Sequence, residues 1–408
     1  MRDRLLNKLI NPSPYSITNQ IPKFLTPMFS YVVLQRILQL KIGKLYDELS
    51  FKMGKSLGRL ITNKLVLLNK NASSSRLIRI FLKEFENLGF GQGLISRLNL
   101  KVGICMISNA TNPIAKQYKK TFGNQKENID FFLAGLYAGC LSKIIAKDCF
   151  FVEKECISKN KNFCIFYLTF DNPFKNEVFE QEEIDNVIIW ENLYSEHKSL
   201  YPNTLIQKII DLGQLKLKSG KLTVWNVYCA FFPMPVFLIT FGFLDKKKIG
   251  VSKELCYMAA VQAKIAILFQ INKFGITNKM ATFNSLLNQL ELFGVGNGKI
   301  IKLEHKKLIA RFSNSYSLFQ FKAMFKDSEL IADIQLNGGS ILGMVQYSLG
   351  KNVKSIKHKI INNDIYYTIG FARDKKDSLI GRYRKEIKNK HIIGIIEERM
   401  EHKYYLLG

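Results

Sequence analysis

FENLGFGQGLISRLNLKVGICMISN, residues 85–109, reappears in altered form as LELFGVGNGKIIKLEHKKLIARFSN, residues 290–314. The two stretches align without a gap, and their glycines and final asparagine coincide. These positions are Gly89, Gly91, Gly93 and Asn109 in the first stretch, and Gly294, Gly296, Gly298 and Asn314 in the second. A period of about half the chain is too long for a solenoid repeat, so the sequence predicts two tandem copies of one domain.

A second pair of segments supports the duplication. LAGLYAGCL, residues 133–141, matches GGSILGMVQ, residues 338–346, and both carry two glycines four positions apart. Glycines at this spacing share one face of a helix and let another backbone approach closely. We therefore expect a first domain at residues 1–170, a linker with some structure at 171–224, a diverged second copy at 225–372 and a charged C-terminal extension at 373–408.

Periodicity within the first copy predicts the order ααββ-α-ββ. Residues 29–65 indicate one long or broken helix, and residues 76–89 a second helix that ends at a glycine. GLISRLNL and KVGICMIS alternate as the strands of a hairpin, and a glycine-containing helix follows at about residues 130–147. DCFFVEKECIS and NFCIFYLTF form the last hairpin. The predicted fold class is α+β, with an antiparallel sheet and helices packed on it.

The composition of the 408-residue chain is that of a globular protein, with 47% hydrophobic and 12% aromatic residues. Its seven cysteines are irregularly spaced, so they predict no disulfide framework. The N-terminus lacks the apolar run of a secretory signal. These observations favour a cytoplasmic protein.

The formal net charge of +27 would attract nucleic acid, anionic lipid or an acidic protein. The alternative is compositional bias, because Lys, Asn and Ile all have A/T-rich codons. No nucleic-acid-binding motif accompanies the charge. Residues 227–244 are uncharged and long enough to span a membrane, but Pro233 and Pro235 disfavour a regular helix, so a buried strand pair is the preferred interpretation.

Glu153, Cys156 and Cys164 have the spacing E-x2-C-x7-C across the last hairpin of the first copy. Two thiolates and a carboxylate are good zinc ligands, and a structural site needs a fourth. On a regular strand Glu153 and Cys156 would face opposite sides, so the site requires a bulge or a strand end. Buried free cysteines are the alternative, and a redox pair is disfavoured because C-x7-C lacks the activation of C-x-x-C.

The order of elements, the G-x3-G helix and the V-E-x2-C-x7-C-x-F segment together resemble the 4-vinyl reductase domain family. Its members share a fold with subunits of the TRAPP vesicle-tethering complex and bind hydrophobic small molecules. The resemblance covers roughly residues 29–170 and 236–371. It implies a hydrophobic ligand and a sensory or regulatory role for this chain.

The resemblance also implies a metal site. In phenol-sensing members, zinc is held by the counterparts of Glu153, Cys156 and Cys164 and by an upstream cysteine. Here that fourth position falls on Asp130, with Cys140 and Cys149 as substitutes if the register differs. The aligned positions of the second copy are poor ligands, so we expect one zinc per chain. They are Ile334, Lys357, Ile360 and Thr368.

No constellation of nucleophile, base and orienting group is present in the sequence, so we expect a binding protein rather than an enzyme. The GFGQG segment precedes a strand instead of a helix and therefore does not predict a phosphate site. The alternative function is a basic interaction protein that binds nucleic acid or a protein partner, including a second copy of itself.

We expect the ligand pocket to be walled by the first helical region and the glycine helix, although the same apolar residues could simply pack together. The expected wall is Val33, Ile37, Leu45, Leu49, Met53, Leu136 and Tyr137.

Overall fold

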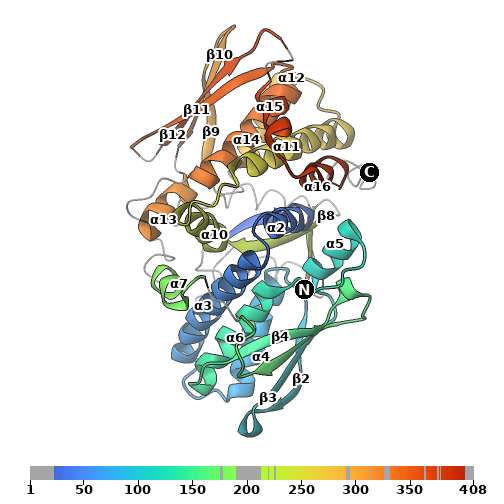
Figure 1. Cartoon of the computed structure of the whole chain (residues 1–408), viewed down its shortest axis with the longest axis vertical. Coiled ribbons are helices and arrows are strands. Elements are labelled where there is room, and N and C mark those ends of the chain that lie inside the picture. Colours follow the sequence, from blue (N-terminus) through green and yellow to red (C-terminus); the bar gives the residue numbers. More distant parts are fainter. Residues whose placement is uncertain are drawn as a thin grey trace. The chain divides into compact units, whose positions relative to one another are not determined.

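The computed structural model describes residues 23–399, except 175–177, 190–212, 219, 225–226, 291–294, 314, 326–330, 363, 375 and 377. Helices pack against antiparallel sheets, which confirms the predicted α+β class (Figure 1). The described residues form two compact units. The first holds the residues as far as Ile239, and the second holds those from Thr240 onward together with Val33–Lys41.

The first unit is built on a four-stranded antiparallel sheet in the order β2-β3-β5-β4. The side chains of Cys105, Ile107 and Phe166 point to the buried face, which the helices α4 and α6 cover, and α3 packs against these two helices (Figure 1). The elements are α3 (Lys44–Leu68), α4 (Ser74–Asn87), β2 (Gly93–Asn99), β3 (Ile104–Asn109), α5 (Pro113–Phe122), α6 (Phe131–Ile145), β4 (Phe150–Glu155) and β5 (Cys164–Thr169).

Helices α3 and α6 touch backbone to backbone through glycines. A Cβ atom on Gly135 would lie 2.0 Å from the carbonyl oxygen of Phe51, and one on Gly139 would lie 2.0 Å from that of Lys55. Real Cβ atoms do not approach so closely, so both positions require glycine. The expected close approach of the G-x3-G helix is therefore present. Gly54 and Gly58 meet α6 in the same way from the side of α3.

The second unit repeats this arrangement. Its sheet has the order β9-β10-β12-β11, which is the order of the first sheet, and Gly339 and Gly343 of α14 meet the backbone of α11 at Cys256 and Ala260. Gly294 and Asn314 of the sequence repeat lie outside the described residues. The elements are α11 (Ser252–Phe274), α12 (Lys279–Gln289), β9 (Asn297–Leu303), β10 (Lys307–Ser313), α13 (Tyr316–Met324), α14 (Ile331–Ser348), β11 (Val353–Ile361), β12 (Asp364–Phe371), α15 (Leu379–Glu386), α16 (Lys390–Gly394) and a π-helical turn at Ile395–Arg399.

A third sheet, in the order β1-β8-β7-β6, was not predicted. Both β1 and β8 run into a helix directly after a proline, at Pro27 and Pro233. The elements are β1 (Lys23–Pro27), α2 (Met28–Ile42), β6 (Leu215–Lys218), β7 (Lys221–Val224), β8 (Val227–Pro233) and α10 (Met234–Lys246). Residues 227–244 thus form a strand and a helix instead of a strand pair, because proline's fixed φ suits a first helical turn.

Part of the expected linker is ordered against α3. The carboxylate of Glu48 accepts hydrogen bonds from the backbone N–H groups of Val178 and Phe179, and Lys52 pairs with the same carboxylate at 3.2 Å. The helix α7 (Gln181–Val187) follows, and its Asp185 pairs with α3. The domain boundaries inferred from the sequence remain a prediction.

Among the described helices, only α11 is long and apolar enough to cross a membrane, by length and composition alone. Of its most apolar window, 67% is buried inside the chain, which is typical of a core helix.

Candidate functional site

The hairpin of β4 and β5 brings Glu153, Cys156 and Cys164 together. Their potential ligand atoms all lie within 4.8 Å of one another, and all three side chains are buried. The two sulfur atoms are 3.7 Å apart. The pairing of β4 with β5 shifts register between Glu153 and Glu155, which is the irregularity that the spacing required. The residues predicted from E-x2-C-x7-C are therefore close enough to share one ion.

The electrostatics of the cluster suit a cation. The Oε2 atom of Glu153 accepts a hydrogen bond from the Ile129 amide, whereas no partner for its Oε1 is found among the described residues. Burial, and then the neighbouring Cys156, raise the pKa of Glu153 well above its usual value. A buried carboxylate oxygen without a partner costs free energy unless something binds it. Together with two sulfurs this donor set fits Zn²⁺.

The two thiols differ in acidity. A hydrogen bond from the Cys164 thiol lowers the pKa of Cys156 to about 6, and a bond with the Ser158 hydroxyl acts in the same direction. Burial, and then the bond to Cys156, raise the pKa of Cys164. The first proton is therefore lost more easily from Cys156 than from Cys164, and a bound cation would favour loss of the second proton.

Asp130, the predicted fourth ligand, is engaged elsewhere. As the N-cap of α6 it accepts a hydrogen bond from the Leu133 amide at 3.4 Å, and its other oxygen accepts one from Asn112 at 2.6 Å. It does not belong to the close group of ligand atoms found in the described part of the chain. Burial, and then the charge of Glu153, raise its pKa to about 7. Its role as a ligand remains a prediction.

The substitute cysteines are also placed elsewhere. Cys149 is hydrogen-bonded to Ser142 through its backbone and its sulfur. Cys140 lines the apolar pocket described below. Neither thiol joins the cluster of Glu153 and the two hairpin cysteines.

The raised pKa of Asp130 makes the metal-free protein sensitive to pH. A carboxyl group with a folded pKa of about 7 binds its proton more tightly when folded, so its contribution to stability is full below its unfolded pKa and is lost as pH rises to about 7. We expect urea unfolding of protein treated with a chelator to show lower stability at pH 8 than at pH 5. Asp130→Asn should flatten this dependence, since asparagine still caps the helix. Equal pH slopes for the two proteins would contradict the assignment.

The second unit has lost the cluster by shortening the hairpin. Ile360 takes the place of Glu153. Glu153 pairs with Phe166 and Ile360 pairs with Ile365, and both partners are buried residues of the next strand. Residues 156–163 connect β4 with β5, whereas only residues 362–363 connect β11 with β12. Among the described residues of the second unit, none therefore corresponds to Cys156.

The gapless alignment of this hairpin was consequently wrong. Lys357 and Thr368, the expected counterparts of Glu153 and Cys164, pair with each other on exposed positions of β11 and β12. The shorter connection shifts the register, which an alignment without gaps does not reveal. The side chain of Ile334 lies outside the described residues.

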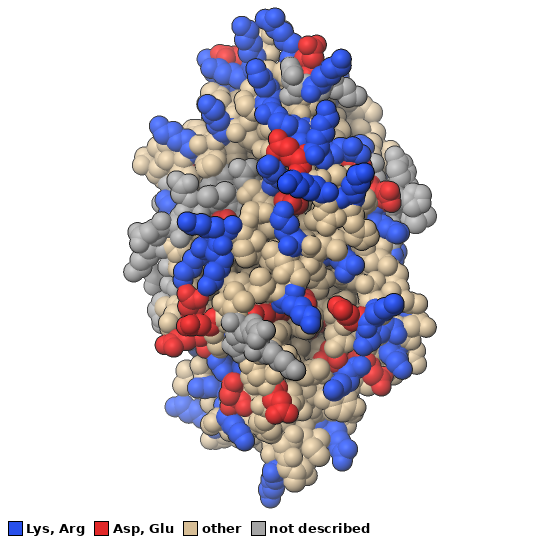
Figure 2. Space-filling model, viewed as in Figure 1, with Lys and Arg blue, Asp and Glu red and all other residues tan. Residues whose placement is uncertain are grey.

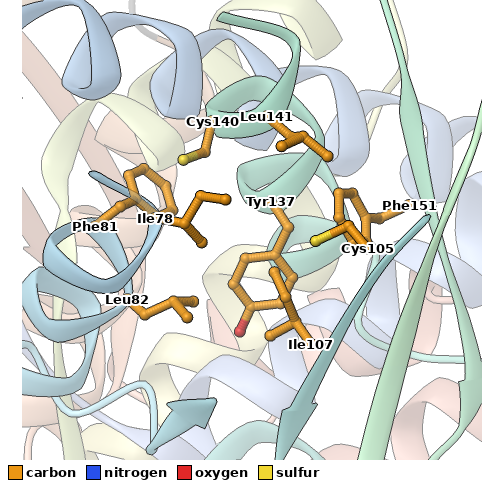
Figure 3. A pocket seen from close by; sticks show the side chains of 9 residues that line it. All are labelled: Ile78, Phe81, Leu82, Cys105, Ile107, Tyr137, Cys140, Leu141 and Phe151. Carbon is orange, nitrogen blue, oxygen red and sulfur yellow. The ribbon is translucent and has the colours of Figure 1, made fainter. Parts of the chain in front are cut away.

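An apolar pocket lies between α4, α6 and the buried face of the first sheet (Figure 3). The space open to the centre of a water molecule is about 10 Å³, which is room for about one water. Besides the thiols of Cys105 and Cys140, the lining carries the hydroxyl group of Tyr137, which points toward the strands. The lining side chains are Ile78, Phe81, Leu82, Cys105, Ile107, Tyr137, Cys140, Leu141 and Phe151.

Of the expected wall, Tyr137 lines this pocket. Leu49, Met53 and Leu136 are buried in the first unit outside the lining, and Leu45 is half-buried. Val33 and Ile37 belong to the second unit. The sequence analysis missed the contribution of α4, although the spacing of Ile78, Phe81 and Leu82 marks one helical face.

Asn109 links the pocket to the turn between α4 and β2, which contains Gly89 and Gly91. Its side-chain amide donates to the Phe90 carbonyl at 3.1 Å, its oxygen accepts from the Thr111 amide at 3.2 Å, and it bonds the Tyr137 hydroxyl. Asn109 is thus a structural residue of this turn. Through Tyr137 it also fixes the polar group of the pocket.

No family model matches the chain, and neither does any curated protein. Among solved structures, the phenol-responsive sensory domain of the transcription activator PoxR, solved with phenol, is 14% identical, with a TM-score of 0.32 over 35% of this chain and 74% of that one. A vinyl-4-reductase family protein from Methanocaldococcus jannaschii is 21% identical, with a TM-score of 0.27 over 42% of this chain and 94% of that one. Values this low support no statement about the activity of this chain.

Proposed function

We propose that the first unit binds a hydrophobic small molecule without transforming it, and that a structural zinc ion braces the adjacent hairpin. The observation that carries this proposal is the pocket between α4 and the sheet, whose lining is apolar except for the Tyr137 hydroxyl and two thiols. A small number of polar groups in an apolar pocket is typical of ligand sites. The 4-vinyl reductase resemblance of the sequence points to the same function.

Binding must rearrange the pocket, because about one water fills the existing space. Helix α4 supplies Ile78, Phe81 and Leu82 from one face, while Lys83 on another face is exposed. A shift of these three side chains would enlarge the pocket without disturbing the glycine contact of α3 with α6. We propose that occupancy of the pocket changes the position of α4, which gives the protein a way to report the ligand.

The pocket can be tested by filling it. Cys105 points from β3 into the pocket, so Cys105→Phe should occupy the space that a ligand needs. We expect organic extraction and mass spectrometry of protein from its native source to recover a hydrophobic molecule from the wild type, and at least tenfold less from the variant.

Cys229→Phe serves as the control, because it places the same ring at another buried cysteine outside the pocket. A variant that unfolds would be recognised by circular dichroism. Equal recovery from folded Cys105→Phe and wild type, or no molecule from either, would rule out this pocket as the binding site.

The metal part of the proposal rests on Glu153, Cys156 and Cys164. A zinc ion there would tie the end of β4 to the start of β5 and add a bond between these strands to their existing pairing. One ion per chain is proposed, since the second unit lacks the loop that carries Cys156. Free cysteines of this kind suit a reducing compartment, in agreement with the proposed cytoplasmic location.

A further inference from the structure

The sheet of the second unit has one buried and one open face. Side chains alternate along a strand, so Leu308, Ala310 and Phe312 of β10 point to the core and are fully buried. The residues between them point outward, and the described helices α12 and α14 lie on the core side. The outward side chains of β10, together with the side chains paired with them across β9, β12 and β11, form what we call the basic face. It consists of Lys299, Lys302, Lys307, Ile309, Arg311, Lys357, Lys359, Tyr366 and Thr368.

Strand pairing arranges these residues in rows. Arg311 of β10 is opposite Lys299 of β9 and Tyr366 of β12, and Tyr366 is in turn opposite Lys359 of β11. The Arg311 guanidinium lies 6.0 Å from the centre of the Tyr366 ring. Neighbouring strands are about 4.8 Å apart, so this row of three cations and one aromatic ring spans about 14 Å. A second row is Lys302, Ile309, Thr368 and Lys357.

Acidic side chains pair with three of the six cations of the basic face and leave the other three exposed. Asp364 pairs with Arg311 at 2.7 Å, and Glu304 in the β9–β10 turn pairs with Lys302 and Lys307. No ion pair is found for Lys299, Lys357 or Lys359 within the described chain, and all three are exposed. Figure 2 shows Lys and Arg crowded, with few acids, at the end of the second unit where Figure 1 places the β9–β10 hairpin.

The first unit provides an internal comparison. Its corresponding row is Arg97, Met106, Tyr167 and Val152, on β2, β3, β5 and β4. The tyrosine is present in both rows, but two of the three cations are replaced by apolar residues. Both sheets come from one chain with one codon bias, so general lysine enrichment does not account for the difference.

We propose that the basic face binds single-stranded nucleic acid. Lysine and arginine rows would hold consecutive phosphates, and the Tyr366 ring would stack on a base. Stacking requires unpaired bases, which is why a single strand fits better than a duplex. This site is separate from the pocket of the first unit and does not depend on the ligand proposed there.

An anionic membrane is the main alternative partner for such a face. Peripheral membrane binding usually adds apolar side chains that insert together. The exposed apolar residues of this sheet are Ile301, Leu303 and Ile361, which are 52%, 45% and 40% exposed. Leu303 precedes the β9–β10 turn and Ile361 precedes the β11–β12 turn at the opposite end of the sheet, so they form no common insertion tip.

The test uses the full chain and a fluorescein-labelled oligothymidylate of about 15 nucleotides, with binding followed by anisotropy. Lys357→Glu/Lys359→Glu should weaken binding at least tenfold and reduce the slope of log K against log salt by about 1.4. Tyr366→Ala should weaken binding about tenfold, whereas Tyr366→Phe should retain it.

Lys70→Glu/Lys101→Glu is the matched control, because it makes the same change in net charge on exposed residues of the first unit. We expect it to change binding less than threefold. Absence of binding by the wild type at low salt, or equal weakening by both double variants, would overturn the proposal. Binding to vesicles of anionic lipid but not to the oligonucleotide would assign the face to a membrane instead.

Discussion

Cys156→Ser protein is expected to contain no zinc and to be less stable than the wild type by about 4 kcal/mol or more. A serine hydroxyl is a poor replacement for a thiolate, and the cluster has at most one further protein ligand to compensate. Loss of the ion also leaves the Glu153 carboxylate buried with an unpartnered oxygen. Elemental analysis of purified protein and urea unfolding would measure the two effects.

Cys229→Ser is the matched control for this experiment. It makes the same thiol-to-hydroxyl change at a buried cysteine of β8, far from the Glu153 cluster in the sequence and absent from its close ligand atoms. We expect it to retain one zinc per chain. A wild type without metal, or equal metal contents in the wild type and Cys156→Ser, would disprove the site.

Gly135→Ala is expected to destabilise the first unit by about 3 kcal/mol or more. The new methyl group would lie 2.0 Å from the Phe51 carbonyl oxygen and 3.0 Å from the Lys55 amide nitrogen. Both are backbone atoms of α3, so no flexible side chain can move aside. The two helices must separate, and the packing along their whole contact is weakened. Thermal and urea unfolding would measure the loss.

Gly250→Ala provides the control, since a Cβ there meets nothing within 4 Å. We expect it to alter stability by less than about 0.5 kcal/mol. Gly343→Ala should reproduce the large effect in the second unit, where the methyl group would lie 2.3 Å from the Ala260 carbonyl oxygen. Similar stabilities for Gly135→Ala and Gly250→Ala would show that the helices can part at little cost.

The features that the sequence predicted well are local or repeated. Helix α4, the hairpin of β2 and β3, and the glycine contact of α6 follow from periodicity and from the need for a missing side chain. The break between α2 and α3 falls at Gly43, whose φ of +60° only glycine adopts easily. The duplication is visible because the glycines recur where the same backbone contacts recur.

The pairing of strands far apart in the chain could not be predicted from the sequence. The β1 strand pairs with β8, about two hundred residues later, and the sequence of neither strand indicates its partner. The four-strand sheet they belong to was therefore missed. The sequence alignment of the last hairpin also failed in the second unit, because its connection is shorter than the one in the first unit and the strand pairing is therefore shifted.

The cluster and the pocket differ in how far the sequence could define them. Glu153, Cys156 and Cys164 carry rare side chains at a hairpin, so their proximity could be predicted. The pocket lining consists of common apolar residues, and burial alone does not distinguish a wall from a core. Only Tyr137 was identified in advance, through its place on the glycine helix.

The pairing of β1 with β8 has a consequence for biosynthesis. At about 5–20 residues per second, the ribosome needs roughly 10–40 seconds to extend the chain from one strand to the other. During that time β1 is an unpaired edge open to wrong partners. A nascent chain cut just after the first repeat would never receive its missing strand, so gene fragments ending near residue 170 are a poor choice for expression, and those reaching past Pro233 are a better one.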